Sequence, residues 1–441
     1  MIEPQKTLSA GIVAPEEVIL VRVSSGPWDE LDSLREIKAL VESAGGRVVE
    51  TFAQKRTAPD PKYYVGSGKL EEVSSAAREL GVSTLVFDHN LSPGQVAKLE
   101  ESTDCKVLDR TEIILAIFAT RARTKEAKLQ IELAQLRYAL PRLTRKWHHL
   151  SRLGAGIGTR GPGETQLEID RRRARSRIRL LESQLDKTKL QGEVRRERRG
   201  NLYRVTLVGY TNAGKSTLMN AFCDAGVYSA DKPFATLDTV SRKLRLGHDD
   251  HILISDTVGF IRRLPETLVA SFEATLANVR TAGLLLVVSD RSREDRQTRL
   301  ATVYRTLERI GAGDIPRLLV WNKMDLARKD LPPRTGIAVS ATRREGLDEL
   351  LKAIRMHRDR RLEWFELSME RPGGKFLNWL YRNCLVRDFD RDGSGVSVLA
   401  GCYPGTERIK SRLGGESFGW TLREVASPAS GDYHESGSGN G

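Results

Sequence analysis

The residues with the clearest chemical meaning form one glycine-rich segment. It reads Gly209, Tyr210, Thr211, Asn212, Ala213, Gly214, Lys215 and Ser216, and Thr217 follows. Glycines at this spacing let backbone N–H groups point at phosphate oxygens, and a helix that starts here adds positive potential. The lysine of this pattern reaches the terminal phosphates, and the serine hydroxyl coordinates Mg²⁺. We therefore expect a nucleoside triphosphate site in which Lys215 acts in catalysis and Ser216 binds the metal.

A second polar segment follows the apolar run 252–254 and consists of Asp256, Thr257, Val258 and Gly259. A carboxylate at this place holds Mg²⁺ through a water molecule, and the Gly259 N–H can bind the terminal phosphate. A threonine between the two segments usually closes over the metal and the phosphate. Thr236 is the expected residue, and Thr239 is the reserve candidate.

A third segment selects the base. The run 318–321 ends in Asn322, Lys323, Met324 and Asp325, an N-K-x-D pattern. The Asp325 carboxylate can accept two N–H groups of guanine that adenine does not offer, and a wrong base would leave a buried carboxylate unpaired. Farther on, Ser340 and Ala341 are expected to supply a backbone amide to the guanine oxygen. The ordered segments predict binding of GTP and GDP and an enzyme that hydrolyses GTP.

The residue after Gly259 is Phe260, where many GTPases have a glutamine that orients the attacking water. Because phenylalanine cannot hydrogen-bond water, we expect slow intrinsic hydrolysis that depends on an added factor. That factor is either a partner surface or a monovalent cation, with K⁺ as the candidate. Asn212 could hold K⁺ with its side-chain oxygen or could stabilise its own loop, and both roles stay open.

The elements that position these residues predict an α/β fold. Each segment follows a short apolar run typical of a buried strand, at 204–208, 252–254 and 318–321, and a helix is expected over 216–222. The full prediction is a P-loop GTPase domain preceded by a small α/β domain with a long helical hairpin and followed by a small α+β domain. The expected boundaries are 1–110, 111–200, 201–360 and 361–426, with a disordered tail at 427–441.

In the first 110 residues, strands are expected at 18–23, 47–52, 83–87 and 106–108 and helices at 28–43 and after Ser92-Pro93. Helix is expected from 111 to about 145, and again from 165 to about 199, with the glycine-rich tip 154–163 between them. These two long helices would pack as a hairpin. In the last domain, two or three strands are expected, among them 362–367 and 395–400, with a helix at 375–383.

Charge is concentrated in the hairpin. The whole chain carries a net charge of +13, and residues 141–200 hold 17 basic and 7 acidic side chains, a difference of 17 − 7 = +10. Such a block attracts the phosphate backbone of a nucleic acid, although a merely solvated helix face is the alternative. No apolar run approaches the ~20 residues of a membrane span, and four scattered cysteines favour a reducing cytosol.

A weaker glycine segment, Tyr64-Val65-Gly66-Ser67-Gly68-Lys69, also precedes a helical pattern. It lacks the full phosphate-loop spacing, so a turn followed by a helix start is the preferred interpretation. A second nucleotide site with ATPase activity in the first domain stays open.

With these residues in view, residues 15–365 resemble the HflX family of ribosome-associated GTPases. The resemblance rests on the following strings: LSPGQ at 91–95, DRT at 109–111, IFA at 117–119, KLQIELAQL at 128–136, GTRGPGETQLE at 158–168, GYTNAGKST at 209–217, FATLD at 234–238 and DTVGFI at 256–261. The family usually continues the fifth residue of FATLD with Pro-Thr, whereas this chain has Thr239-Val240-Ser241, which puts the contacts of this threonine segment in question.

The resemblance implies a cytoplasmic, monomeric hydrolase that binds the large ribosomal subunit, ribosomal RNA and whole ribosomes, and that the ribosome stimulates. It further implies a stress-response factor that splits or rescues stalled ribosomes, with the hairpin reaching toward the peptidyl transferase centre. Two other functions stay open: a GTPase that assembles the large subunit, and a non-splitting module that sequesters idle ribosomes.

Overall fold

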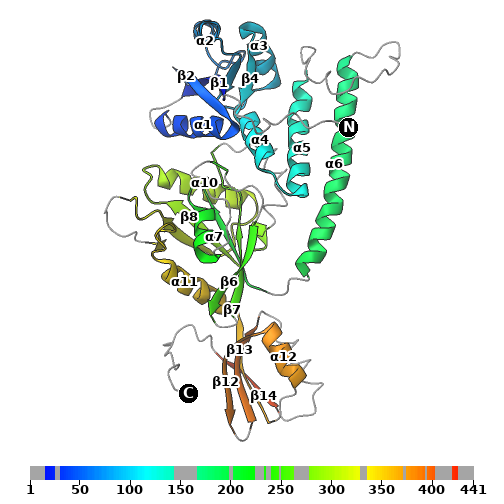
Figure 1. Cartoon of the computed structure of the whole chain (residues 1–441), viewed down its shortest axis with the longest axis vertical. Helices are drawn as coiled ribbons and strands as arrows, with labels where there is room; N and C mark the ends of the chain where they lie inside the picture. The colour runs from blue at the N-terminus through cyan, green and yellow to red at the C-terminus, as the bar shows by residue number, and fades with distance from the viewer. Residues whose placement is uncertain are drawn as a thin grey trace.

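The computed structural model describes residues 15–24, 30–143, 166–197, 202–223, 233–234, 240–247, 250–262, 278–327, 335–370, 374–392, 395–402 and 420–425. These residues form three sheets that follow one another along the long axis of the molecule (Figure 1). The predicted tip 154–163 and tail 427–441 lie outside the described residues. The domain boundaries expected from the sequence stay predictions.

The first sheet is parallel and has the strand order β2-β1-β3-β4. Its elements in chain order are β1 (Glu16–Ser24), α1 (Glu30–Ala44), β2 (Gly46–Lys55), α2 (Ser67–Leu80), β3 (Thr84–Phe87), α3 (Pro93–Thr103) and β4 (Lys106–Asp109). All four predicted strands are confirmed to within three residues at each end. The predicted start of α3 is also confirmed, because the Ser92 hydroxyl accepts from the backbone N–H of Gln95 and Pro93 opens the helix.

The second glycine segment forms a turn and a helix start. Gly66 is the residue before α2, and its N–H donates to the Gln54 side-chain oxygen at 2.8 Å. Lys69 forms an ion pair with Glu72 on the same helix. These contacts agree with the preferred sequence interpretation and account for the segment without a ligand.

The expectation of one helical run from 111 to 145 was wrong. The structure has two helices here, α4 (Arg110–Arg121) and α5 (Lys125–Ala139), followed by the short 3-10 helix η2 (Leu140–Arg142). The chain turns at Ala122, which has extended backbone angles, and the Thr124 hydroxyl caps α5 by accepting from Ala127 N–H. Helix α4 packs against α1 of the first sheet, and only α5 belongs to the hairpin.

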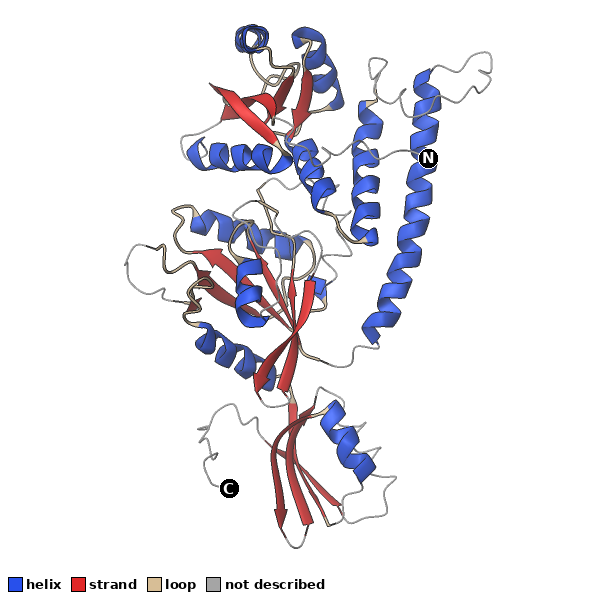
Figure 2. Ribbon diagram, in the orientation of Figure 1, coloured by secondary structure: helices blue, strands red, loops and turns tan. Residues whose placement is uncertain are grey.

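Helix α5 pairs with the 32-residue helix α6 (Gln166–Glu197), and the two run antiparallel (Figure 2). Their contact is a small apolar cluster made of Leu129, Leu133, Leu181 and Leu185. Ion pairs flank it, with Arg137 on Glu182 at 2.6 Å and Arg177 on Glu132 at 2.7 Å. The predicted hairpin is therefore confirmed in its two helices.

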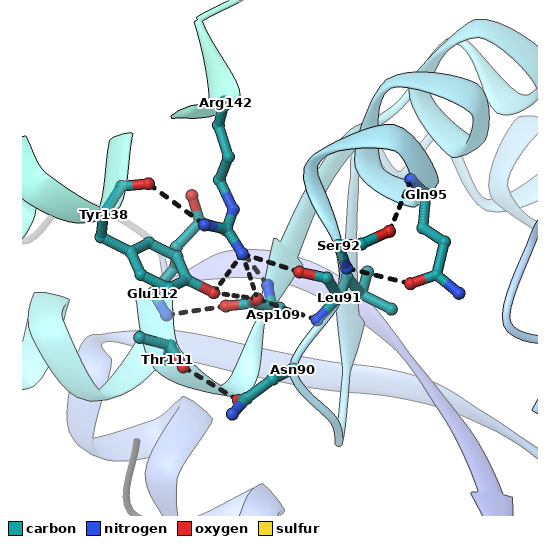
Figure 3. A network of polar contacts seen from close by, with 9 residues as sticks. All are labelled: Asn90, Leu91, Ser92, Gln95, Asp109, Thr111, Glu112, Tyr138 and Arg142. Atoms are coloured by element: carbon teal, nitrogen blue, oxygen red, sulfur yellow. Dashed lines mark hydrogen bonds and ion pairs between the residues drawn. The ribbon is translucent and has the colours of Figure 1, made fainter. Parts of the chain in front are cut away.

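A buried polar network fixes the end of α5 to the first sheet (Figure 3). The Asp109 carboxylate accepts from the Leu91 N–H at 3.1 Å, from the Tyr138 hydroxyl and from the Arg142 guanidinium at 3.4 Å. Arg142 also donates to the Leu91 carbonyl at 2.7 Å and lies 3.6 Å from the Tyr138 ring centroid. The strings at 91–95 and 109–111 therefore anchor the root of the hairpin.

The same network predicts a pH-dependent stability. Burial, and then the nearby Asp109 carboxylate, raise the pKa of Glu112 from 4.5 to about 7. Between these two values the unfolded chain has released a proton that the folded protein still holds, so stability falls as the pH rises through this range. Glu112→Gln can still accept from the Asp109 N–H and should stabilise the protein at pH 8 by about 1–2 kcal/mol but not at pH 4.5.

Thermal unfolding at the two pH values measures this effect, with the exposed Glu79→Gln as the control. An equal change in stability at pH 4.5 and pH 8 would contradict the prediction.

The second sheet has the order β10-β9-β8-β5-β7-β6, parallel except for β6. Its elements are β5 (Arg204–Gly209), α7 (Lys215–Cys223), β6 (Val240–Gly247), β7 (Asp250–Asp256), β8 (Leu284–Asp290), α10 (Arg296–Arg309), β9 (Arg317–Asn322), β10 (Ile337–Ala338) and α11 (Leu347–Asp359). Strand β8 is buried over Leu284–Val288, as expected for a central parallel strand. The three predicted strands and the helix after the glycine segment are confirmed.

The third sheet is antiparallel, with the order β12-β13-β11-β14, and α12 covers one face of it (Figure 2). Its elements are β11 (Glu363–Met369), α12 (Gly374–Asn383), β12 (Leu385–Asp392), β13 (Gly395–Cys402) and β14 (Trp420–Val425). It has four strands rather than the two or three expected. The sequence of β12 is rich in charge, so the pattern of apolar runs does not predict this strand.

A buried ionic cluster joins the last two sheets. Arg358 at the end of α11 binds the Asp250 carboxylate with both terminal nitrogens, and Arg387 of β12 reaches Asp359 at 2.8 Å.

None of the helices that the structure describes combines the length and the apolar character needed to cross a bilayer.

Candidate active site

The glycine segment connects β5 to α7, as the sequence predicts. Two of its glycines have no room for a side chain. A Cβ on Gly209, which has φ +157°, would lie 2.2 Å from the Val288 carbonyl oxygen, and one on Gly214, with φ +87°, would lie 2.2 Å from the Asn322 side-chain nitrogen. The loop therefore adopts a tight course beside β8 and β9 that only glycine permits at these two points.

Lys215 begins α7 and is buried. Its ammonium donates to the carbonyl oxygens of Tyr210 at 3.1 Å and Gly209 at 3.3 Å. Burial lowers the pKa of Lys215 from 10.5 to about 8, and the Asp256 carboxylate opposes this shift. The lysine is thus folded back onto its own loop. A negatively charged group bound beside it would favour the charged ammonium and raise its pKa again.

Ser216 and Asp256 meet at the end of β7. The Ser216 hydroxyl donates to an Asp256 carboxylate oxygen at 2.6 Å, although 40 residues separate them. A hydroxyl and a carboxylate are both hard oxygen ligands of the kind that Mg²⁺ prefers. The structure therefore brings together the two described residues that the sequence assigns to the metal.

The segment after β7 lies directly against the glycine loop. Phe260 donates its N–H to the Gly209 carbonyl at 3.0 Å and accepts from the Thr211 N–H at 2.8 Å. A Cβ on Gly259 would lie 2.9 Å from the Lys215 nitrogen. Thr257 is turned away, because its hydroxyl donates to the Leu207 carbonyl of β5 at 2.7 Å. Gly259 is thus beside the lysine, whereas the Thr257 side chain is structural.

The residues predicted to select the base lie at the other end of the loop. Asn322 joins two segments, because its side chain donates to the Ala213 carbonyl at 3.0 Å and accepts from the Ala341 N–H at 3.1 Å. The Ser340 hydroxyl donates to one Asp325 carboxylate oxygen at 2.7 Å. The predicted partners are therefore assembled, and the Ala341 amide would have to share its hydrogen with a guanine oxygen.

The remaining predicted residues have diverse surroundings. Lys323 pairs with Asp290 at 3.0 Å, Val258 packs against the core, and Thr217 is partly buried. Asn212 is exposed and has a left-handed backbone with φ +62°. Thr236 and the reserve Thr239 lie outside the described residues.

Sequence reasoning missed the contacts between this site and the first sheet. The Tyr210 hydroxyl, in the glycine loop, donates to the Glu36 carboxylate of α1, and Glu36 also pairs with Arg110 of α4. Phe234 packs on Phe118 of α4 with ring centroids 4.7 Å apart. The sequence carries no local signal for these pairs, since each joins residues at least 74 positions apart.

Comparison with known proteins gives three adjoining family matches. Residues 31–119 match the family described as GTP-binding GTPase N-terminal, residues 121–199 match GTP-binding GTPase Middle Region, and residues 204–323 match 50S ribosome-binding GTPase. Together they cover the first sheet apart from β1, the hairpin and most of the second sheet.

Full-length relatives agree with these matches. The chain is 45% identical to GTPase HflX of Escherichia coli over 397 residues, which cover 87% of this chain and 93% of that protein. It is 42% identical to GTPase HflX of Caldanaerobacter subterraneus over 403 residues, which cover 90% of this chain and 93% of the relative. A GTP-binding protein from Sulfolobus solfataricus in complex with GDP is a similar solved structure, with 26% identity, a TM-score of 0.42 and coverage of 77% of this chain and 98% of that one. The chain is a GTP-binding, GTP-hydrolysing enzyme with a P-loop α/β fold, and it belongs to the HflX family of GTPases.

Proposed function

We propose that this GTPase binds the large ribosomal subunit in its GTP state and splits or rescues stalled ribosomes in the cytoplasm during stress. The observation that carries the proposal is a basic face on the hairpin, attached to a GTPase domain. Arg172, Arg175 and Arg179 follow one another at spacings of three and four on α6, and all three are exposed. Their face lies away from Leu181 and Leu185, which pack on α5.

The basic face suits ribosomal RNA. Arginines in a row along a helix can track a phosphate backbone, and they carry no arrangement that would read a base sequence. The family that matches residues 204–323 is described as 50S ribosome-binding GTPase, which agrees with this partner. The protein would act as a monomer, with the hairpin as its probe of the RNA.

The nucleotide site would work through the residues assembled above. Ser216 and Thr236 would hold Mg²⁺, Asp256 would hold it through a water molecule, and the ion would supply charge that stabilises the triphosphate. Lys215 would turn from its loop carbonyls to the terminal phosphates, and the Gly259 N–H would orient the last one. The backbone around Gly209, Ala213 and Gly214 would cradle the other phosphates, and Asp325 would accept from guanine.

Phe260 accounts for the need for an activator. It is buried among apolar residues of α4 and the second sheet and offers no group to hold a water molecule. The large subunit would therefore supply or organise the group that positions water. K⁺ beside Asn212 is the second candidate, and equal turnover in K⁺ and Na⁺ would remove it.

The decisive experiment is GTP turnover with and without purified large subunits at physiological salt. We expect strong stimulation, and we expect the triple change Arg172→Ala, Arg175→Ala and Arg179→Ala to reduce it by about tenfold through lost phosphate contacts. A matched variant removes three exposed positive charges from the second sheet's helices, at Arg305, Arg309 and Lys352, and should keep the stimulation. Turnover without ribosomes should be unchanged in both variants.

The outcomes separate the alternatives. Absence of stimulation in the wild type would contradict the ribosomal partner while leaving the GTPase assignment intact. Stimulation that both triple variants keep would contradict the role of the hairpin face. Sedimentation of ribosomes with a non-hydrolysable GTP analogue then distinguishes splitting, which depletes whole ribosomes, from sequestration or assembly, which does not.

A further inference from the structure

The glycine loop and the segment after β7 are tied to the first sheet through one tyrosine. The Tyr210 hydroxyl donates to a Glu36 carboxylate oxygen and accepts from the Arg262 N–H at 2.9 Å. The other Glu36 oxygen pairs with Arg110, which also donates to the Arg262 carbonyl at 3.3 Å. Both backbone polar groups of Arg262 are therefore held, one by the glycine loop and one by the first sheet.

This arrangement, which we call the Tyr210 latch (Glu36, Arg110, Tyr210 and the backbone of Arg262), is buried. Arg110 is 1% exposed, Tyr210 is 3% exposed and Glu36 is 9% exposed. Arg110 makes a second ion pair with Asp88 at 2.7 Å, so the cluster has two carboxylates around one guanidinium. Hydrogen bonds to charged groups are strong when water is excluded, so the latch resists separation of the two sheets.

The latch holds residues 259–262 next to Lys215, where the terminal phosphate of GTP would have to bind. Arg262 is three residues from Gly259. Gly259 lies so close to the glycine loop that an added Cβ would be 2.7 Å from Thr211 Cα and 2.9 Å from the Lys215 nitrogen. A terminal phosphate bound by both Lys215 and the Gly259 N–H needs these groups farther apart. GDP ends one phosphate earlier and makes no such demand on the segment.

We propose that Tyr210 is a positioning residue that makes the binding of GTP, but not of GDP, depend on the docking of the first sheet. While its hydroxyl is bound to Glu36, residues 259–262 stay against the glycine loop. GTP then binds at the cost of breaking the latch, and by linkage anything that opens the latch favours GTP. Arg110 is the first residue of α4, the helix that leads into the hairpin, so movement of the hairpin has a direct path to this segment.

The inference rests on the nucleotide site proposed above and not on its ribosomal partner. The test measures equilibrium affinities of the full chain for fluorescent GDP and for a fluorescent non-hydrolysable GTP analogue. Tyr210→Phe removes one oxygen and keeps the ring beside Arg299, whose guanidinium lies 4.5 Å from the ring centroid. We expect its affinity for the GTP analogue to rise by about five- to tenfold, and its affinity for GDP to stay within about twofold.

Glu36→Gln tests the same latch from the first sheet, outside the nucleotide site. It should shift the ratio of the two affinities in the same direction, and the double variant should shift it by less than the product of the single effects, because both changes break one unit. Tyr304→Phe on α10 is the matched control and should keep the wild-type ratio.

Three results would overturn the proposal. The first is a wild-type affinity ratio in both single variants. The second is a parallel loss of GTP and GDP affinity, which would mean that the changes only distort the loop. The third is full additivity in the double variant. Failure of the wild type to bind either nucleotide would instead refute the nucleotide site itself.

Discussion

Replacing Asp325 by asparagine is expected to lower the affinity for GTP by about 100-fold or more, with a gain for xanthosine triphosphate. The Ser340 hydroxyl holds one carboxylate oxygen of Asp325, and Asn322 ties the same region to the glycine loop and to Ala341. The carboxylate is thus fixed before the base arrives. Guanine presents two N–H donors to it, and an amide replaces one acceptor by a donor, which leaves a guanine N–H without a partner.

Xanthine has a carbonyl where guanine has its amino group, so it accepts from the new amide. Competition between GTP, ATP and xanthosine triphosphate for a fluorescent nucleotide measures the change. Asp314→Asn, an exposed substitution before β9, is the matched control and should leave GTP preferred. Retention of wild-type GTP affinity by Asp325→Asn would show that another group selects the base.

The positions of the nucleotide residues were predictable because local patterns define them. Strands β5, β7 and β9 are short apolar runs, and in a parallel sheet their carboxyl ends meet at one edge. Gly209 and Gly214 mark a loop course that only glycine allows, so the motif and the geometry agree. The contact between Ser216 and Asp256, the two residues predicted to hold the metal, follows from the same logic.

Other features were not predictable for identifiable reasons. The break at Ala122 contains neither glycine nor proline, and its one signal, the cap at Thr124, was overlooked. Strand β12 carries five charged residues among eight and lacks an apolar run. The hydrogen bond from Tyr210 to Glu36 joins residues 174 positions apart, and no pattern around the tyrosine indicates its partner. Neighbouring residues determine local structure, whereas the packing of one sheet's domain on another depends on surfaces that form only when the chain has folded.

Replacing Gly259 by alanine is expected to lower the rate of GTP hydrolysis by about 100-fold while GDP affinity changes little. The new Cβ would meet Thr211 Cα at 2.7 Å and Thr211 Cγ2 at 2.9 Å, which are too short to keep, and backbone cannot swing aside as a flexible side chain can. The segment must therefore move away from the loop. Its N–H then leaves the position from which it would stabilise the charge that develops on the terminal phosphate.

Single-turnover hydrolysis and nucleotide affinity together measure this prediction. Gly68→Ala is the matched control, because a Cβ there meets nothing within 4 Å, and it should keep the wild-type rate. Hydrolysis at the wild-type rate in Gly259→Ala would contradict a role for this N–H. Gly259→Ala and Tyr210→Phe should differ in their effect on hydrolysis. In both variants the segment moves and the restraint on GTP binding is relieved, but only the added methyl group of Gly259→Ala displaces the Gly259 N–H. We therefore expect unproductive GTP binding from Gly259→Ala and tight, productive binding from Tyr210→Phe.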